Sequence, residues 1–383
     1  MNSHIASVLE KIVYMRSVVL FFAGFLSLFA LSACSSNDTP TIQTIVEEEV
    51  SQLLSQPGYS AVSGVVILNG DSYSVHKGVL ENDQRPDDFT LYEIGSLTKT
   101  YTGLLLAQAV NDGHMNLDDP VSIYLPNMEA AIFQRQEETA TIRDLATHTS
   151  GLPVNLTCTG DELTVDERLD CFRNYDRELF FSFLSQSSLQ DRPGTQYRYS
   201  NAGIRLLSHI LEDVYDSTYP DLLDRFIFPR TGETDTHFRT NPSNIDRLAI
   251  GHNETGSIMP NASDYYFGAG ALKTSTESFA QYLAFYLDDE NALSRNALTL
   301  LAGDPDGLGR AYVWNTFRLE TEGMYYHSGG TFGTSSWVAL YPRESLGIFL
   351  VSPYVSPNAQ GELNETANRI VERLRTLMEV EAQ

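Results

Sequence analysis

The chain has 383 residues, a length that suits one large domain or two smaller ones. It carries 50 acidic and only 25 basic side chains, for a formal net charge of −25. Such an excess of negative charge argues against nucleic acids and anionic membrane surfaces as partners, and it says nothing about catalysis.

The N-terminal segment is typical of a targeting signal rather than of a folded domain. Basic residues precede an apolar run over 18–31, which is shorter than the roughly 20 residues that a membrane-spanning helix needs. The run ends in Leu-Ser-Ala-Cys34, which resembles the lipobox of bacterial lipoproteins. We therefore expect residues 1–33 to be a lipoprotein signal peptide and Cys34 to become the lipidated first residue. An uncleaved anchor and an ordinary secretory signal remain the alternatives.

Ser35 directly follows this cysteine, and a serine here resembles lipoproteins that are sent to the outer membrane. A lipid on Cys34 would anchor the protein to a bilayer without a spanning helix. We expect a lipid-anchored protein of the bacterial cell envelope, at the outer membrane and facing the periplasm.

Beyond a short tether over 34–41, strand patterns lie near both ends of the chain and helical patterns lie between them. Ile42 to Leu54 has helical spacing, and a β-hairpin is predicted around the turn Asn69-Gly70-Asp71. The chain from about 115 to 300 is mostly helical and loop-like. The late elements are four β-rich runs and a closing amphipathic helix: 310–319, 324–331, 335–341, 347–351 and 364–378.

This distribution predicts an α/β (α+β) fold in one domain over 42–383. Residues 42–95 and about 300–383 would build one antiparallel sheet from both chain ends, flanked by helices. Residues from about 96 to 300 would form an inserted, mostly helical subdomain. The alternative, two independent domains split near residue 300, would leave the N-terminal hairpin without enough partners to be stable.

Ser96 and Lys99 are the first residues that indicate a reaction. If this run is helical, residues three apart share a face, so the hydroxyl and the amine meet. A serine hydroxyl needs a neighbouring base, and lysine serves only if burial or another cation lowers its pKa. The apolar residues over 104–110 predict a buried helix, which provides that environment. A polar helix start with a solvated lysine is the alternative, because Ser-x-x-Lys also arises by chance.

Two later runs add polar groups of the same kind of site. Tyr199 and Asn201 precede an apolar helix beginning near Ile204. A phenol acts as acid or base if cationic neighbours lower its pKa, and an Asn amide offers a donor and an acceptor to an amide-like substrate. The run from His327 to Gly330 lies on a predicted strand, where paired glycines let backbone approach a ligand closely.

Three further residues have structural interpretations. His148 ends a short helix in a tight turn, and we interpret it as a turn histidine that bonds backbone near the site. Cys158 and Cys171 lie in one polar stretch of an exported chain, which predicts a local disulfide, with two separate buried thiols as the alternative. The sequence has no Cys-x-x-Cys or His-Glu-x-x-His spacing, so we expect no metal.

Taken in order and spacing, these motifs resemble the serine β-lactamase and penicillin-binding family, in its class C and carboxypeptidase-esterase branch. The resemblance runs from about residue 43 to 378 and implies a β-lactamase/transpeptidase-like fold. It implies that Ser96 is the nucleophile, that Lys99 is its partner, and that Tyr199 is an acid and base.

The same resemblance assigns binding roles. It implies that the substrate is bound by Asn201, His327, Ser328 and Gly329. The backbone N–H groups of Ser96 and Gly330 would form the oxyanion hole, where each donor contributes about 3 kcal/mol.

The implied function is that of a serine hydrolase with an acyl-enzyme and no cofactor. Its substrates would be β-lactams, D-Ala-containing wall peptides or small esters. The alternative is a penicillin or wall-peptide sensor that acylates but does not turn over. One position departs from the family: its third motif has lysine, whose charge holds the substrate's carboxylate, and His327 stands here. Histidine is mostly neutral near pH 7, so it would hold an anionic substrate less tightly.

Overall fold

The computed structural model describes residues 40–381 except 159–162, 262 and 320–321. The expected signal peptide over 1–33, the lipidation site Cys34 and nearly all of the tether over 34–41 lie outside the described residues. Within the described part of the chain, no helix combines the length and the apolar character needed to cross a membrane.

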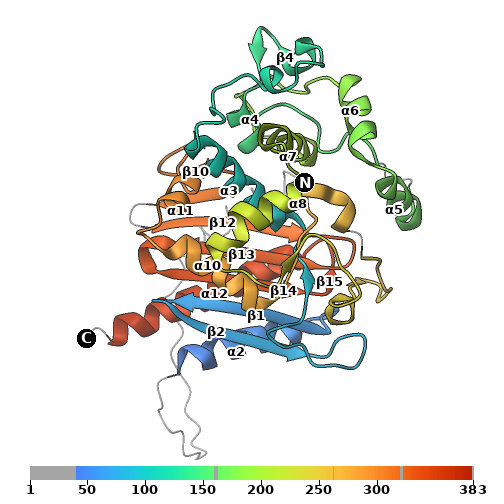
Figure 1. The fold of residues 1–383 in the computed structure, drawn as a ribbon. Helices are drawn as coiled ribbons and strands as arrows, with labels where there is room; N and C mark the ends of the chain where they lie inside the picture. Colours follow the sequence, from blue (N-terminus) through green and yellow to red (C-terminus); the bar gives the residue numbers. More distant parts are fainter. Residues whose placement is uncertain (1–39, 159–162, 262, 320–321, 382–383) are drawn as a thin grey trace, which may run out of the picture. The chain divides into compact units, whose positions relative to one another are not determined.

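An eight-stranded sheet forms the centre of residues 40–381, in the order β2-β1-β14-β13-β12-β11-β10-β9. The N-terminal strand β1 pairs antiparallel with the C-terminal strand β14, with Ser63 opposite Val351. The predicted sheet built from both chain ends is therefore confirmed (Figure 1). The strands of this sheet are β1 (Ala61–Leu68), β2 (Asp71–Gly78), β9 (Ala302–Gly303), β10 (Leu308–Arg310), β11 (Asn315–Leu319), β12 (Glu322–Gly330), β13 (Ser335–Tyr341) and β14 (Leu346–Ser352).

The predicted hairpin is present between β1 and β2. Asn69 and Gly70 both have positive φ angles, 52° and 89°, as the tight hairpin turns with two left-handed residues require. Asn and Gly adopt this conformation more readily than other residues, which is why the dipeptide predicts the turn.

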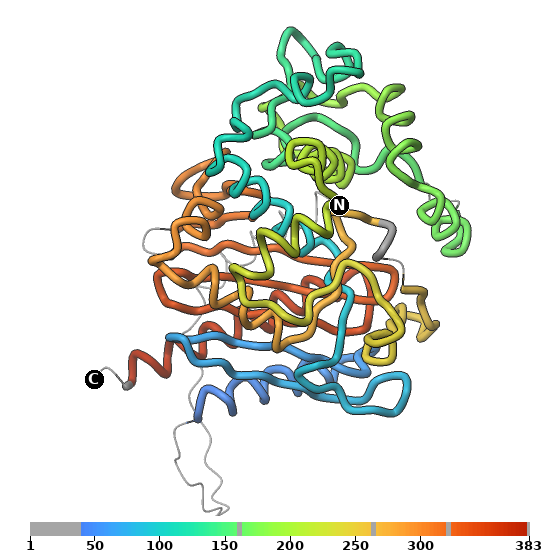
Figure 2. The backbone as a smooth tube through the Cα atoms, viewed as in Figure 1, coloured from blue at the N-terminus to red at the C-terminus, as the bar shows by residue number. Residues whose placement is uncertain are grey.

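Helices cover both faces of the sheet. Helices α2 (Ile42–Leu54) and α12 (Ala359–Glu381) pack on one face, and α10 (Thr276–Leu287) packs on the other. Figure 2 shows the two ends of the described chain side by side, in blue and red. All eight residues of β1 are buried, because alternate side chains point to opposite covered faces. Val62, Val66 and Leu68 join the core under α2 and α12, whereas Ala61, Val65 and Ile67 join the core under α10.

A helical region lies at the side of the sheet away from the β1–β2 hairpin (Figure 1). Its central element is α3 (Thr98–Asn111), which is buried from Thr98 to Ala109. The buried helix predicted over 104–110 is therefore present, although Val110 is only half-buried. The other helices are α4 (Ile142–Ala146), α5 (Val165–Arg173), α6 (Arg177–Ser185), α7 (Asn201–Tyr215), α8 (Tyr219–Leu222), α9 (Phe228–Thr231) and α11 (Ala292–Ala297).

Short elements complete the fold. The two-residue strands are β3 (Tyr92–Glu93), β4 (Gln134–Arg135), β5 (Glu138–Thr139), β6 (Thr236–His237), β7 (His252–Asn253), β8 (Lys273–Thr274) and β15 (Tyr354–Val355). The short helical turns are η1 (Gly95–Leu97), η2 (Val121–Tyr124), η3 (Ala130–Phe133), η4 (Leu223–Ile227), η5 (Ile245–Arg247), η6 (Ser263–Ala269) and η7 (Pro342–Glu344).

The run over 310–319 differs from its prediction as one β-rich run. The structure divides it into the end of β10, a turn over 311–314 and β11. The Ala311 N–H donates to the Trp314 carbonyl, and Val313 has a φ of 70°. Trp314 is fully buried, and the Val313 N–H bonds the carbonyl of Ala146 at the end of α4. Tertiary packing therefore bends a run whose β-branched and aromatic residues favour a continuous strand.

Candidate active site

Ser96 is the middle residue of η1, and Lys99 lies one turn later at the start of α3. Nζ of Lys99 donates a 2.9 Å hydrogen bond to Oγ of Ser96 and another to the carbonyl of Ala269. The meeting of hydroxyl and amine that the spacing predicts is present.

The side chain of Lys99 is completely buried. Burial lowers its pKa well below the usual value, because a low-dielectric surrounding disfavours the ammonium form. A neutral amine has a lone pair that can take a proton from the serine hydroxyl. The condition for a lysine base is therefore met.

Tyr199 brings a second polar group to the same serine. Its Oη donates a 2.6 Å hydrogen bond to Oγ of Ser96. The next residue, Ser200, caps α7 by accepting from the Gly203 N–H, and this cap holds the tyrosine at the helix entrance. Nζ of Lys99 is 5.0 Å from the centroid of the Tyr199 ring.

From the sequence we expected cationic neighbours to lower the pKa of this phenol, and in the structure the pKa is raised instead. Burial raises the pKa of Tyr199, and the hydrogen bond with Ser96 offsets only part of that increase. In the unliganded site, Tyr199 is therefore a neutral proton donor.

The backbone of η1 lies directly against the backbone at the end of β12, with no side chain between them. Gly95 has a φ of 53°, and a Cβ there would lie 2.7 Å from the Gly330 nitrogen and 2.6 Å from its oxygen. A Cβ on Gly329 would lie 2.1 Å from the Ile94 carbonyl oxygen. These distances leave no room for a side chain, so glycine is required on both sides of the contact.

The hydrogen-bond pattern of β12 leaves the Gly330 N–H available. Thr331 donates to the Thr334 carbonyl, which places Gly330 and its partner Ser335 at the adjacent, non-hydrogen-bonded position. The Gly330 N–H therefore points away from β13. On the side of β12 away from β13, the neighbouring strand β11 pairs with β12 only as far as Tyr326. Among the described strands, none pairs with the last residues of β12 on this side, where η1 lies. This geometry suits an oxyanion hole made with the Ser96 N–H.

His327 is buried on the same stretch of β12, with 3% of its surface exposed. Burial first, and the charges of Lys99 and Arg310 after it, lower its pKa to about 3. The ring is therefore neutral near pH 7. Its Nδ1 lies 2.7 Å from the carbonyl oxygen of Ser328, which can only accept, so Nδ1 carries the proton and Nε2 is an acceptor.

Asn201 opens α7, directly after the cap residue that follows Tyr199. Its Nδ2 donates a 3.0 Å hydrogen bond to Oδ1 of Asn155. The sequence alone does not place Asn155 in the site, because its partner is 46 positions away and no spacing rule connects the two.

His148 has the structural contacts that its turn position predicts. It is buried, with a φ of 58°, and its Nδ1 accepts from the Ser200 N–H at 3.2 Å. Its carbonyl also accepts from the Arg198 N–H. His148 thus holds the backbone on both sides of Tyr199.

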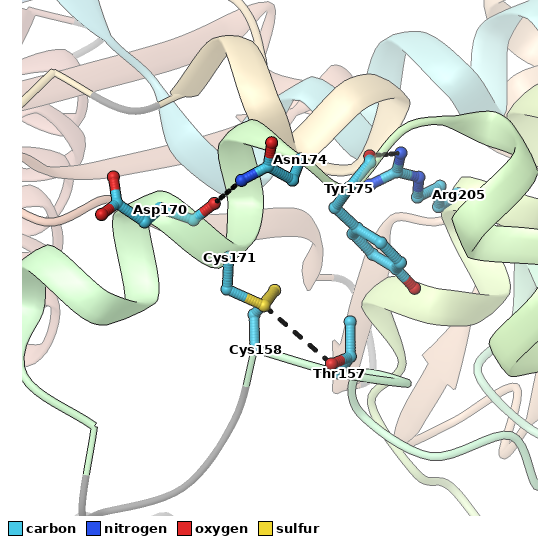
Figure 3. Close-up of a disulfide and its surroundings, with 7 residues drawn as sticks. All are labelled: Thr157, Cys158, Asp170, Cys171, Asn174, Tyr175 and Arg205. Carbon is cyan, nitrogen blue, oxygen red and sulfur yellow. Dashed lines mark hydrogen bonds between the residues drawn. A yellow bond between two sulfur atoms is a disulfide. The ribbon is translucent and has the colours of Figure 1, made fainter.

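A disulfide joins Cys158 to Cys171, the pair expected from the sequence. Figure 3 shows it linking the loop after Thr157 to α5. Beyond α5, the carbonyl of Tyr175 accepts from the guanidinium of Arg205 on α7 (Figure 3). The crosslink therefore fastens the segment that contains Asn155 close to the helix that contains Asn201. Within the described residues, no three His, Cys, Asp or Glu side chains gather as metal ligands would.

Comparison with known proteins decides the family. The family model described as Beta-lactamase matches residues 46–373. The chain belongs to the beta-lactamase family. Among its relatives, Protein flp of Staphylococcus aureus (strain MRSA252) is 26% identical over 349 residues, which cover 88% of this chain and 65% of that protein. A Beta-lactamase of Pseudomonas fluorescens is 24% identical, over 83% of this chain and 95% of that protein.

Solved structures with the same fold include other beta-lactamase family proteins. A class C beta lactamase from Rhodobacter sphaeroides superposes with a TM-score of 0.71 at 21% identity, over 86% of this chain and 99% of that one. A Beta-Lactamase/D-Alanine Carboxypeptidase from Pseudomonas syringae gives 0.73 at 18% identity, over 86% and 98%. These likenesses establish the fold of this family member. The chain spans about two thirds of the length of the Protein flp relatives.

Proposed function

We propose that this protein is a serine hydrolase that works through an acyl-enzyme on Ser96. The observation that carries the proposal is the convergence of two groups on one oxygen. Nζ of Lys99 lies 2.9 Å and Oη of Tyr199 lies 2.6 Å from Oγ of Ser96. One group has a lowered pKa and the other a raised pKa, which suits a base and an acid respectively.

Acylation then follows from these protonation states. The neutral amine of Lys99 takes the proton of the Ser96 hydroxyl as Oγ attacks the substrate carbonyl. The developing oxyanion is held by the N–H groups of Ser96 and Gly330. Tyr199 donates its proton to the leaving group, and the proton on Lys99 restores the phenol.

Hydrolysis of the acyl-enzyme repeats these steps with water as the attacking group. Water gives a proton to the Lys99–Tyr199 pair while its oxygen attacks the acyl carbonyl. The bond to Oγ breaks, and Ser96 regains a proton. Failure of this second half would make the protein a sensor that acylates without turnover.

The site and the related structures together support a proposal for the substrate class. We propose D-Ala-containing wall peptides, β-lactams or small esters, since class C beta-lactamases and D-alanine carboxypeptidases share the fold. The neutral ring of His327 supplies no charge for an anionic group and favours the ester over the β-lactam.

The test is acylation and turnover by a Ser96→Ala variant. We expect it to lose hydrolysis of a chromogenic cephalosporin and of a p-nitrophenyl ester, and to lose the penicillin adduct that mass spectrometry detects on the intact protein. Ser55→Ala is the control, because Ser55 is exposed at the end of α2. Undiminished turnover of both substrates by Ser96→Ala would refute the proposal, and a wild-type adduct that never decays would indicate the sensor.

We further propose that Cys34 carries a lipid that anchors the protein to the outer membrane, facing the periplasm. The support is the sequence run that ends in Leu-Ser-Ala-Cys34 and continues with serine. The full chain expressed in a bacterium should partition into detergent and sediment with outer membranes, and Cys34→Ala should not. A mature protein whose mass shows no lipid contradicts this proposal.

A further inference from the structure

Phe267 lies just before the backbone that bonds the proposed base. Its φ of 52° and ψ of −144° fall in a region that glycine adopts readily and that a bulky side chain strongly disfavours. The carbonyl of Ala269, two residues later, accepts a hydrogen bond from Nζ of Lys99. A strained residue therefore directly precedes a backbone contact of the candidate active site.

The backbone after Phe267 folds back in a tight turn. The Phe267 carbonyl accepts from the N–H groups of Gly270 and Ala271, at 3.1 and 3.0 Å. Gly268 lies close against α7, since a Cβ there would be 1.9 Å from Oγ of Ser208. The turn and this close approach leave the chain little freedom, so the φ and ψ angles of Phe267 determine how the next two carbonyls are aimed.

Helix α3 donates to this turn from two side chains. Lys99 donates to the carbonyl of Ala269, and Thr102, three residues later, donates to the carbonyl of Gly268 at 2.7 Å. Residues three apart share a helix face, so two adjacent carbonyls bond the same side of α3. Rotating the peptide planes after Phe267 would break both hydrogen bonds.

Ring contacts hold Phe267 in its strained conformation. The ring of His209 on α7 stacks on the Phe267 ring, with centroids 4.5 Å apart and planes 26° apart. Tyr219 and Phe238 contact the same ring at 5.3 and 5.8 Å, and the Arg205 guanidinium lies 5.8 Å from its centroid. A glycine would adopt these backbone angles without strain but would lose all four ring contacts. Strain of this kind persists only where the surroundings over-determine the conformation, and it is concentrated at functional sites.

We propose that Phe267 is a positioning residue for the base, because its stacked ring keeps the Ala269 carbonyl aimed at Nζ of Lys99. The carbonyl can only accept, so it fixes one N–H of the neutral amine and lets the lone pair reach the hydroxyl of Ser96. Helix α7 would then position both partners of the serine, the phenol at its entrance and the amine through His209. This inference rests on the hydrolase function proposed above.

The first test separates acylation from substrate binding. Stopped-flow kinetics with a chromogenic cephalosporin give the acylation rate constant and the dissociation constant of the non-covalent complex. We expect Phe267→Gly to lower the rate constant about 10- to 100-fold and to change the dissociation constant less than about twofold, because a misplaced base slows only the chemical step. An unchanged rate constant, or a loss that lies entirely in binding, overturns the proposal.

Thermal unfolding of Phe267→Gly and Phe267→Ala tests the strain itself. Alanine usually stabilises a protein relative to glycine, because it restricts the unfolded chain. At a position with positive φ this order reverses, so we expect the glycine variant to have the higher Tm. An equal or higher Tm for Phe267→Ala shows an unstrained backbone and contradicts the proposal.

His209 offers a second pair of variants, which decides the question if Phe267→Gly does not fold. His209→Phe keeps a ring that can stack and should acylate at close to the wild-type rate, whereas His209→Ala should lose about 10-fold. Both variants lose the hydrogen bond between Nδ1 and Glu212, so a difference between them reports the ring alone. Equal acylation rates in the two variants refute the role of the stacked ring.

Phe181→Ala is the matched control. Phe181 on α6 is half-buried like Phe267 and contacts the same histidine, with ring centroids 5.6 Å apart, but it lies outside the turn. Its loss should leave the acylation rate constant unchanged. A fall as large as that of Phe267→Gly would show a general loss of packing and would rule out a specific role for Phe267.

Two outcomes separate this inference from the function on which it rests. If the wild type acylates Ser96 and Phe267→Gly does so equally fast, only the role of Phe267 fails. If no substrate leaves an adduct on Ser96 of the wild type, both proposals fail.

Discussion

The amine of Lys99 controls when Ser96 can react, because only the unprotonated amine accepts the serine proton. Burial lowers the pKa of Lys99 well below its usual value of about 10.5. The rate of Ser96 acylation should therefore rise with pH along a limb whose midpoint lies well below that value. Stopped-flow measurement with a chromogenic cephalosporin gives this profile.

Lys99→Arg tests the same point with a long basic side chain that stays protonated. A guanidinium does not give up its proton in proteins, so acylation should fall about 10²- to 10⁴-fold, the usual contribution of a general base. Lys77→Arg is the control, because Lys77 is a half-buried residue of β2 that pairs with Glu47. Near-wild-type acylation in Lys99→Arg rules out the amine as the base.

At the residue scale, spacing in the sequence predicts only the side-chain contacts that helix geometry determines. The contact between Ser96 and Lys99 follows from a separation of three residues. Tyr199 lies 103 positions from Ser96 in the sequence, so only the resemblance to a family could suggest their contact. Asn155 and Arg310 carry no motif, so their places beside Asn201 and Tyr197 emerge only from the folded chain. The raised pKa of Tyr199 has the same origin, since burial is a property of the whole fold.

At the scale of elements, the contact between η1 and β12 depends on two glycines, Gly95 and Gly329. Gly95→Ala should abolish acylation, because its Cβ would push Gly330 away from the serine. Gly70→Ala is the matched control: Gly70 also has a positive φ, but a Cβ there meets nothing within 4 Å.

Both alanines must adopt a positive φ, which costs on the order of 1 kcal/mol, and denaturant unfolding measures the total loss of stability in each variant. Only Gly95→Ala should lose acylation of Ser96 by penicillin. If the two variants acylate equally well, close backbone approach does not set the geometry of the site.

Elements with a strong local signal were predicted well, and those bent by packing were not. The predicted helix Ile42–Leu54 and hairpin agree with α2, β1 and β2. The closing helix α12 is longer than the predicted 364–378, because it runs from Ala359 to Glu381 and includes polar residues at both ends. The run over 310–319 looks continuous in sequence, yet the buried Trp314 turns it back toward α4.

At the scale of the whole molecule, a buried carboxyl makes the stability of the fold depend on pH. Glu233 accepts from Tyr101 of α3 at 2.7 Å and from Thr231 and Thr236 beside it, at 2.8 and 2.6 Å. Burial raises its pKa to about 7, and these hydrogen bonds offset part of the increase. The folded state therefore holds this proton more tightly than the unfolded state does.

The sign of the effect follows from that difference. From about pH 4.5 to 7 the folded state binds more protons at Glu233, so its contribution to stability falls by about 3 kcal/mol and then levels off. Thermal unfolding should show a steeper loss of Tm over this window in the wild type than in Glu233→Gln. The exposed Glu379→Gln should keep the wild-type slope. Parallel curves for all three proteins would contradict the assignment.

The pairing of β1 with β14 also has a consequence for how the chain is made. Oγ of Ser352 donates to the carbonyl of Ala61, across 291 positions of sequence. A lone hairpin is marginal in water, and distant pairings form slowly, so β1 and β2 wait for almost the last strand to be synthesised. For the export to the periplasm that we propose, such a polypeptide would stay open while it is threaded through a translocation channel from its N-terminus. It would close only once nearly all of it has emerged on the far side.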